Sequence, residues 1–443
     1  MRTFLFIFLF WPGTHTFIYA QTQIKTYYDS TKTILKEEYF ILGNDSNMVD
    51  GPYLMLHENG EKSVVGHFEA GKKHGRFTEF YANGLLKREM DYVKGLREGK
   101  VLVYTPEGNL AQEGNFQNDT LTGILTVYYP SGNTRSISEF KNGKPEGDVK
   151  EFYPDGNLKE HIQYKEGKQN GIARTFYEDG TVHTEANYKN GTLEGYFKTF
   201  HPNGQLDTES FHEGGVRSSS FKTYASDGQI LIDGFYKNGK LDGVNKAWYP
   251  NGQIKHTFTY RNGSRVGEGI VYYETGEVKE RTIYSKEEKD RRSTKYYENG
   301  NIKSERFFKN DVPSDTWKHY HENGSLKETE SYTNGRLTGI KTIYDEKGRI
   351  IEELPHQNGL KSGEARTYYP SGKLKSTTTY QLNRKTGAFI SYYENGNIET
   401  RGEYIRDIKV GKWENFKKNG KLIQEQIYRR GELTETIEFE QEE

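Results

Sequence analysis

The sequence repeats with a period of 24 residues, and this period limits the possible folds more than any other feature. One glycine marks each copy, and sixteen such glycines follow at 24-residue intervals without a gap, from Gly60 to Gly420. A fixed period of this length is typical of repeat proteins, in which each unit packs on its neighbours. We therefore predict one repeat array over residues 51–428 instead of about three globular domains.

Composition favours a thin sheet over a layered enzyme. Only 33% of the residues are hydrophobic, while 14% are aromatic, so aromatic rings must supply much of the packing. The net charge of -1 argues against nucleic acid or anionic lipid as a partner, because both require clustered basic residues. The chain has no cysteine, which excludes disulfides, thiolate metal sites and cysteine nucleophiles.

Both ends differ from the array. Arg2, the apolar stretch 4–11 and Tyr19-Ala20 are typical of a secretory signal peptide, so we predict cleavage near Ala20. The mature protein is then secreted, periplasmic or in the cell envelope, with no transmembrane segment. Residues 21–50 are predicted to be an N-terminal capping region. Residues 429–443 are predicted to be a C-terminal cap with an acidic tail, because charge protects a sheet edge from pairing.

The marker glycine closes a predicted β-hairpin. Proline occurs two residues before it in six copies, and asparagine or aspartate occurs directly before it in eleven. This pattern predicts a type I turn followed by a left-handed glycine, with a two-residue turn as the rival. The glycines are represented by Gly252, Gly276, Gly300 and Gly324.

Cross-strand pairing decides between the two turns. The residue four before the glycine is aromatic in fifteen copies, and the residue two after it is Leu, Ile or Val in fourteen. Only the longer turn makes them direct neighbours, which is a favourable pair. An aromatic residue eight after the glycine is expected on the same face, and a second glycine turn returns the chain. The fold class is therefore predicted to be all-β: an elongated, twisted antiparallel meander of sixteen hairpins.

Two segments break the pattern. Residues 285–292 replace the second turn with a charge run, and residues 310–316 lack both of its glycines. We interpret them as solvated, altered turns, and keep a partner-specific surface or a flexing point as the alternative.

The core sequence Tyr-Tyr-x-[Asn/Asp]-Gly-x-[Leu/Ile]-Lys, as in residues 296–303, resembles the MORN repeat. It is most similar to the bacterial YwqK-type variant, which is associated with toxin–antitoxin systems. The resemblance covers about residues 50–428. It implies β-hairpin repeats that bind or support a partner, and it makes Tyr297, Glu298, Asn299, Gly300 and Ile302 framework residues.

Catalytic motifs are not found. The many carboxylates recur in turn slots, as Glu274, Glu298 and Glu322 do, where a role in the turn is expected. His319 and His321 share a strand face, but His321 occupies a slot that usually holds tyrosine. We predict no catalytic residue, no cofactor and no metal.

The residue three before the glycine is the one feature not assigned to packing. It is tyrosine in nine copies and histidine in three, and Tyr249, Tyr273, Tyr297 and His321 form an unbroken series. Tyrosine is a good strand former that tolerates half exposure, so a structural role is one interpretation. An exposed ladder of tyrosines is the other, since such rings make good binding surfaces.

We expect an exported, non-enzymatic scaffold that binds a protein or a cell-envelope component. A carbohydrate-binding envelope protein that uses the tyrosine ladder is the first alternative. An antitoxin or immunity-type protein that neutralises a toxin is the second.

Overall fold

The computed structural model describes residues 21–43, 45–285 and 288–439, so the predicted signal peptide and the last residues of the acidic tail lie outside it. The contacts divide the chain into two compact units. One comprises the described residues through Gln205 together with His212–Gly215, and the other comprises Leu206–Phe211 and the described residues from Val216 onward. All the regular structure of the described residues is β-strand.

The strands of the first unit have these bounds: β1 (Gln21–Tyr27), β2 (Leu35–Leu42), β3 (Val49–Leu56), β4 (Lys62–Glu69), β5 (Lys72–Lys73), β6 (Gly75–Phe80), β7 (Leu86–Val93), β8 (Leu96–Tyr104), β9 (Leu110–Gln117), β10 (Thr120–Tyr128), β11 (Thr134–Lys141), β12 (Lys144–Phe152), β13 (Leu158–Lys165), β14 (Lys168–Phe176), β15 (Val182–Lys189) and β16 (Thr192–Phe200). Strand β17 (Leu206–Glu213) contributes residues to both units.

The strands of the second unit have these bounds: β18 (Val216–Tyr224), β19 (Ile230–Lys237), β20 (Lys240–Leu241), β21 (Gly243–Trp248), β22 (Ile254–Arg261), β23 (Ser264–Arg265), β24 (Gly267–Tyr272), β25 (Val278–Tyr284), β26 (Arg291–Tyr296), β27 (Ile302–Lys309), β28 (Val312–Tyr320), β29 (Leu326–Thr333), β30 (Arg336–Tyr344), β31 (Ile350–Gln357), β32 (Leu360–Lys361), β33 (Gly363–Tyr368), β34 (Leu374–Gln381), β35 (Arg384–Tyr392), β36 (Ile398–Ile405), β37 (Ile408–Phe416), β38 (Leu422–Arg429) and β39 (Glu432–Glu438).

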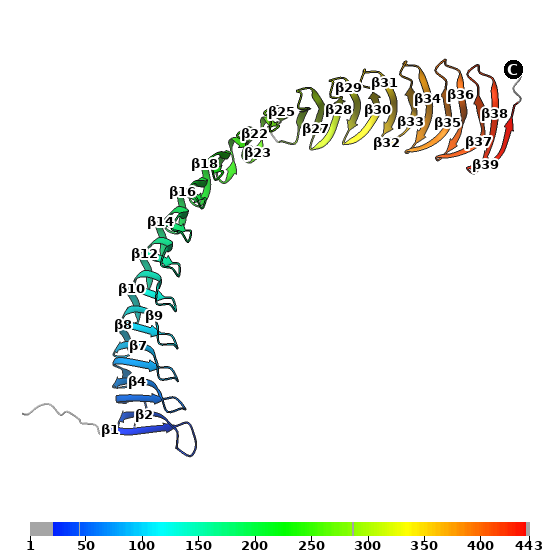
Figure 1. Cartoon of the computed structure of the whole chain (residues 1–443). Coiled ribbons are helices and arrows are strands. Elements are labelled where there is room, and N and C mark those ends of the chain that lie inside the picture. Colours follow the sequence, from blue (N-terminus) through cyan, green and yellow to red (C-terminus); the bar gives the residue numbers. More distant parts are fainter. Residues whose placement is uncertain (1–20, 44, 286–287, 440–443) are drawn as a thin grey trace, which may run out of the picture. The chain divides into compact units, whose positions relative to one another are not determined.

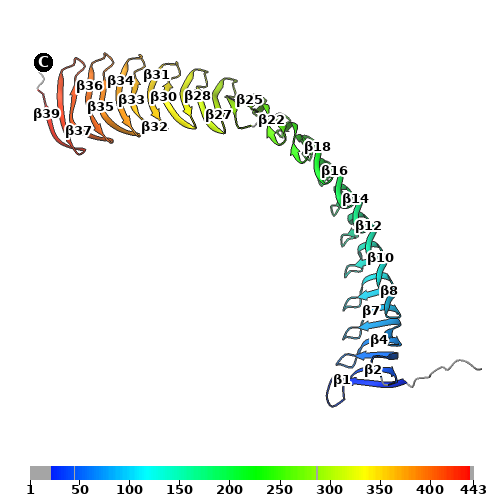
Figure 2. The same ribbon diagram turned by 180° about the vertical axis from the view of Figure 1, so that it is seen from behind.

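Within each unit, successive strands along the chain pair antiparallel, as β7 does with β8 and β29 with β30. The predicted all-β meander is therefore confirmed. The N-terminal residues join it, because β1 pairs with β2 and β2 with β3. The ribbon views from the front and from behind show no second layer of described structure over the strands of either unit (Figures 1 and 2). Each unit must therefore stabilise a single sheet with contacts between side chains of that sheet.

The predicted hairpin turn is confirmed. In one representative copy, the Gly252 N–H donates to the Tyr249 carbonyl at 3.0 Å, and the Tyr249 N–H donates to the Gln253 carbonyl at 2.8 Å. Gly252 has φ of +87°, a conformation that glycine adopts without steric cost. Trp248 then lies opposite Ile254, as predicted for the longer turn. Gly276, Gly300 and Gly324 have the same left-handed conformation.

The predicted apolar face was wrong, because each hairpin contains a β-bulge next to its turn that the prediction did not include. After the Trp248–Ile254 pair, the next pair joins Ala247 to His256, so Lys255 has no opposite residue. The extra residue shifts the alternation of side chains. The residues four, six and eight after the glycine therefore lie on the face opposite to the residue two after it. No aromatic residue four before the glycine is fully buried; all are partly buried.

The most buried side chains occupy two other slots, seven residues before and six residues after each glycine. We call these positions the core row. They pair across the hairpin, as Asn245 does with Phe258, and between neighbouring hairpins, as Met90 does with Val101. Buried members include Phe77, Met90, Val101, Ile162, Ala186, Phe258, Leu354, Ala365 and Trp413.

Large and small side chains alternate within the core row, which lets rings lie on the sheet backbone. A Cβ atom added to Gly66 would lie 2.4 Å from the Phe77 ring, and one added to Gly402 would lie 2.2 Å from the Trp413 ring. Phe77 also contacts Phe68 and Tyr92 edge-on, with ring centroids 5.3 and 5.2 Å apart. Such pairs stabilise a structure beyond the area that they bury. This packing replaces the missing second layer.

The second predicted turn consists of two separate features. Asn238 and Gly239, with φ of +50° and +75°, form a two-residue turn between Lys237 and Lys240. The chain then pairs briefly as β20 before Gly243, with φ of +104°, interrupts the ladder. The second glycine thus belongs to a bulge that bends the strand. Ser219 and Asp315 replace this glycine and keep a left-handed φ, of +62° and +57°.

Candidate functional site

Strand β26 departs from the bulged pattern. Arg291 stands where the bulge glycine normally lies, and β25 pairs with β26 without a register shift from Glu280–Lys295 to Tyr284–Arg291. The connection before β26 is longer than in other repeats, and it is closed by the Ser285 N–H donating to the Asp290 carbonyl at 2.9 Å. The first segment that breaks the sequence pattern is therefore a local loss of the bulge.

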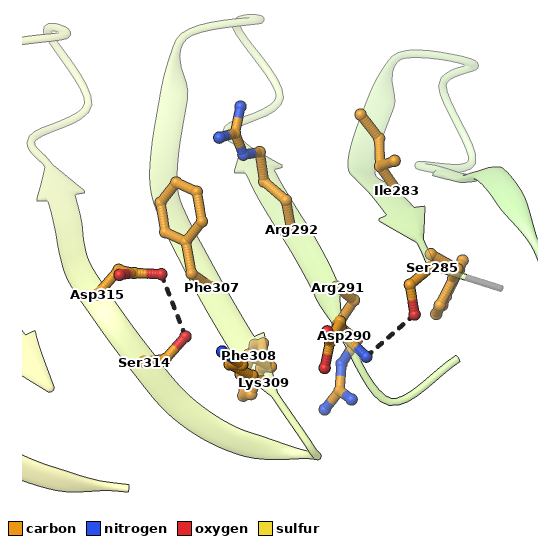
Figure 3. Close-up of a pocket in the computed structure, with 11 residues that line it drawn as sticks. Ile283, Ser285, Asp290, Arg291, Arg292, Phe307, Phe308, Lys309, Ser314 and Asp315 are labelled. Atoms are coloured by element: carbon orange, nitrogen blue, oxygen red, sulfur yellow. Dashed lines mark hydrogen bonds between the residues drawn. The ribbon is translucent and has the colours of Figure 1, made fainter. Parts of the chain in front are cut away.

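This loss leaves a shallow, open depression of about 440 Å³ in the second unit. Figure 3 shows its lining, which comes from the ends of β25 and β27, from the starts of β26 and β28 and from the connection before β26. Its residues are Ile283, Tyr284, Ser285, Asp290, Arg291, Arg292, Phe307, Phe308, Lys309, Ser314 and Asp315. Both irregular segments of the sequence, 285–292 and 310–316, therefore contribute to one site. The sequence marked both segments but gave no sign that they meet.

Two arginines on aromatic rings dominate the depression. Arg291 lies over the Phe308 ring at 4.2 Å and pairs with Asp311, with Nη1 2.6 Å from Oδ1. Arg292 lies over the Phe307 ring at 4.6 Å, is exposed, and has no ion pair with any described residue. A guanidinium that lies over a ring still presents its N–H donors to a carboxylate. Arg292 is therefore the group most available to an external anion.

The acidic groups nearby already have partners. The Asn310 N–H donates to Asp290 Oδ1 at 2.9 Å, and the Asp290 N–H donates to Ser285 Oγ at 3.3 Å. Ser314 Oγ lies 3.3 Å from Asp315 Oδ2, the contact drawn in Figure 3. The lining also presents apolar and cationic side chains. Its chemistry is that of recognition: apolar area from Ile283 and Phe307 beside a cation.

The predicted ladder of tyrosines lies elsewhere and is partly buried, so its expected exposure was wrong. Each hydroxyl donates to the backbone carbonyl 23 residues later, in the next repeat. The Tyr249, Tyr273 and Tyr297 bonds are 2.9, 2.8 and 2.9 Å long. His321 Nε2 lies 3.1 Å from the Tyr344 carbonyl oxygen in the same arrangement. The same bond is made by Tyr81, Tyr129, Tyr153, Tyr177, Tyr369 and Tyr393.

Asparagine side chains add further hydrogen bonds between the repeats, and lysine side chains lie over the tyrosine rings. Asn251 Nδ2 donates to the Glu274 carbonyl at 2.9 Å, and Asn299 Nδ2 donates to the Glu322 carbonyl at 3.1 Å. A lysine three residues after the glycine lies over the ring in several repeats, as Lys303 does over Tyr297 at 5.1 Å. Burial raises the pKa of Tyr273. The geometry gives the ladder a structural role, and its use as a binding surface stays a prediction.

Removing the ladder hydroxyls should therefore cost stability. Changing Tyr249, Tyr273 and Tyr297 together to phenylalanine removes three bonds between repeats, each contributing about 0.5–1.5 kcal/mol. We expect a lower midpoint of chemical denaturation and faster amide exchange near these repeats. The control is Tyr188→Phe, because this ring lies outside the ladder and its hydroxyl makes no hydrogen bond with a described residue. Equal stability of the triple variant and the control would show that the hydroxyl bonds contribute nothing.

One charged cluster has the composition of a metal site. The ligand atoms of His319, Glu328 and Glu330 all lie within 4.8 Å of one another, and the side chains are partly buried. Lys341 Nζ lies 3.0 Å from Glu328 and 2.8 Å from Glu330. Burial lowers the pKa of His319, and Arg306 adds to this effect. Burial opposes the charged forms of Glu330 and Lys341, but their mutual hydrogen bond lowers the pKa of the acid and raises that of the lysine.

The family pattern of the MORN repeat variant matches twelve segments, which together make up more than half of the chain. They are residues 73–94, 97–118, 121–142, 145–166, 169–190, 193–213, 241–262, 292–310, 316–334, 361–382, 385–406 and 409–430. The chain belongs to the MORN repeat variant family. One MORN variant match ends at Asn190, the first residue of the two-residue turn Asn190-Gly191, so the family unit corresponds to one hairpin with its bulge.

Solved structures share little with this MORN variant chain. One is TcdB2-TccC3 without its hypervariable C-terminal region, at 11% identity and a TM-score of 0.14, covering 92% of this chain and 26% of that chain. Another is the Photorhabdus luminescens Tc holotoxin pore, at 12% identity and a TM-score of 0.13, covering 88% and 26%. The chain thus spans about a quarter of the length of these proteins. No curated protein matches the chain.

None of the described residues forms a helix that is long and apolar enough to cross a membrane.

Proposed function

We propose that this MORN variant protein is an exported, non-enzymatic scaffold that binds another protein or a cell-envelope component through the depression at β25–β28. The supporting observation is the combination of exposed Ile283, the Phe307 ring and Arg292, which has no ion pair with a described residue, at the place where the repeat pattern breaks. Interfaces concentrate affinity in a few apolar and arginine side chains. The ladder is less suited to this role, because its hydroxyls already bond within the sheet.

The positive charge of Arg292 limits the chemical class of the partner. A protein segment that places a carboxylate beside an aliphatic or aromatic side chain would pair with the guanidinium and cover Ile283 and Phe307 at once. Carbohydrate binding and toxin neutralisation remain outcomes of the test below.

The test is a pull-down from an envelope extract with the mature protein and two matched variants. Ile283 and Ile340 are both 52% exposed, but only Ile283 lines the depression. We expect Ile283→Asp to reduce partner retention at least tenfold, because a carboxylate would stand beside the partner's own acidic group. Ile340→Asp should retain the partner as the wild type does.

Far-UV circular dichroism verifies that both variants fold. Equal retention by the two variants would reject the depression as the binding surface. Retention of a glycan or of a toxin-like protein would replace the proposed partner class.

The proposed export of the protein is tested by a separate measurement. We propose that the mature chain starts near Gln21, as the signal-like N-terminus predicts. Intact mass of the protein isolated from its native host decides this, and a full-length chain in the cytosol would contradict it.

A further inference from the structure

The core row changes character at one place. Of its members, only Arg306, Glu330 and Lys341 are charged, and they lie in three consecutive repeats of the second unit. Everywhere else the row is filled by uncharged side chains. Partial burial of charged groups costs desolvation energy, so a charged cluster in this row is a candidate functional site.

Strand pairing brings together a histidine of β28 and two glutamates of β29. Glu328 and Glu330 are two residues apart on β29, so their side chains share a face. His319 on β28 pairs directly with Glu328, and its Nε2 lies 3.9 Å from Glu330 Oε2. One nitrogen and two carboxylate oxygens thus converge from rigid strands rather than from loops.

A second observation comes from the serine on the other side of the histidine. Ser304 on β27 is the cross-strand partner of His319 and is only 1% exposed. Its hydroxyl has no hydrogen-bond partner among the described residues. A histidine that binds a metal commonly orients its ring with a bond from the other ring nitrogen to a neighbouring polar group. Ser304 places an unused hydroxyl on the strand where such a partner is needed.

We propose that His319, Glu328 and Glu330 form a binding site for a divalent transition-metal ion such as Zn²⁺, which Lys341 closes in the metal-free protein. The donor set suits zinc, which takes imidazole and carboxylate ligands, whereas Ca²⁺ and Mg²⁺ prefer oxygen alone. Three protein ligands leave the fourth position of a tetrahedral ion open. Ligand atoms around zinc lie roughly 3.3 Å apart, so small side-chain rotations suffice from the observed spacing.

Lys341 competes with a metal ion for the two carboxylates. Its ammonium lies between the two carboxylates, where it neutralises the charge that a metal ion would neutralise. The side chain is 21% exposed, and a long flexible stem lets the ammonium move to water when an ion enters. The metal therefore replaces one cation by another and leaves no carboxylate unpaired.

The test uses the folded full-length mature protein with Zn²⁺ in calorimetry and Co²⁺ in visible absorption. We expect weak binding by the wild type and at least tenfold tighter binding by Lys341→Met, because the competing ammonium is gone. Lys295→Met is the matched control: Lys295 also pairs with a glutamate, Glu280 at 3.8 Å, but no metal cluster among the described residues includes it. This control should bind as the wild type does.

The ligands are tested in the Lys341→Met background. His319→Gln keeps the size and polarity of the side chain and should lose the tight binding together with the Co²⁺ absorption bands. Trp317, which lies in the core row opposite Glu330, reports the fold and the ion by fluorescence. No binding by either wild type or Lys341→Met would overturn the site. Unchanged binding by the His319→Gln variant would overturn its ligand set, and equal binding with and without Lys341 would overturn the closing role of the lysine.

Discussion

Replacing Trp413 by alanine should lower the free energy of unfolding by about 3–5 kcal/mol, the range for large aromatic residues in cores. Trp413 is 2% exposed, and its ring is stacked on Phe389 and edge-on to Tyr404, with centroids 5.6 and 5.0 Å apart. Lys409 lies over the same ring at 4.2 Å. Because repeats pack mainly on their neighbours, the loss of amide-exchange protection should concentrate in β35–β38.

Trp248 is the matched control for this change. It is a tryptophan of the same chain in the slot that the sequence indicated as core, but it is only partly buried and lies on the opposite face from the core row. We expect Trp248→Ala to cost about 1–2 kcal/mol, in proportion to its smaller buried area. Guanidinium denaturation of both variants compares them directly. A larger loss for Trp248→Ala would favour the apolar face that the sequence pattern predicts.

The sequence predicted the regular part of the fold because backbone chemistry is local. Proline, asparagine and glycine at fixed positions specify the turn at Gly252, and the pairing of Trp248 with Ile254 follows from it. The bulge residue Lys255 left no comparable signal, since lysine suits any exposed position. Without it, simple alternation placed the wrong residues in the core. Glycines six residues after the marker, such as Gly66 and Gly402, were the available clue, because a strand glycine often marks a close approach.

The candidate site was only partly predictable for a different reason. The charge run at 285–292 and the missing glycines at 310–316 were visible as exceptions to the period. Arg291 and Asp311 join the two segments through an ion pair. This contact could not be predicted without knowing which hairpins are neighbours. The cluster at His319 was hidden in the same way. Its two glutamates are at positions that lie on the face of the core row only because of the bulge. The cluster could therefore be predicted only after the bulge was known.

Aromatic rings lie close against some of the strand glycines. We therefore expect a single added methyl group to destabilise the protein at one glycine and to have no such effect at another. In Gly402→Ala, the new Cβ would lie 2.2 Å from Trp413 Cδ2, and the ring is held by its aromatic neighbours. Overpacking of this kind costs about 1–3 kcal/mol. In Gly114→Ala, the nearest atom is a flexible end of Leu125, at 3.0 Å.

Neither glycine has a left-handed φ, so backbone strain does not separate the two changes. Gly114→Ala should be neutral or stabilise by about 0.4–1 kcal/mol, because alanine restricts the unfolded chain. Adding Trp413→Leu to Gly402→Ala should cost less than the sum of the two single changes, since the smaller side chain vacates the space that the new methyl group fills. Thermal and chemical unfolding of the four variants measures this coupling. Strict additivity would mean that Trp413 does not rest on Gly402, and the alternation of large and small residues would then not explain how a single sheet is stabilised.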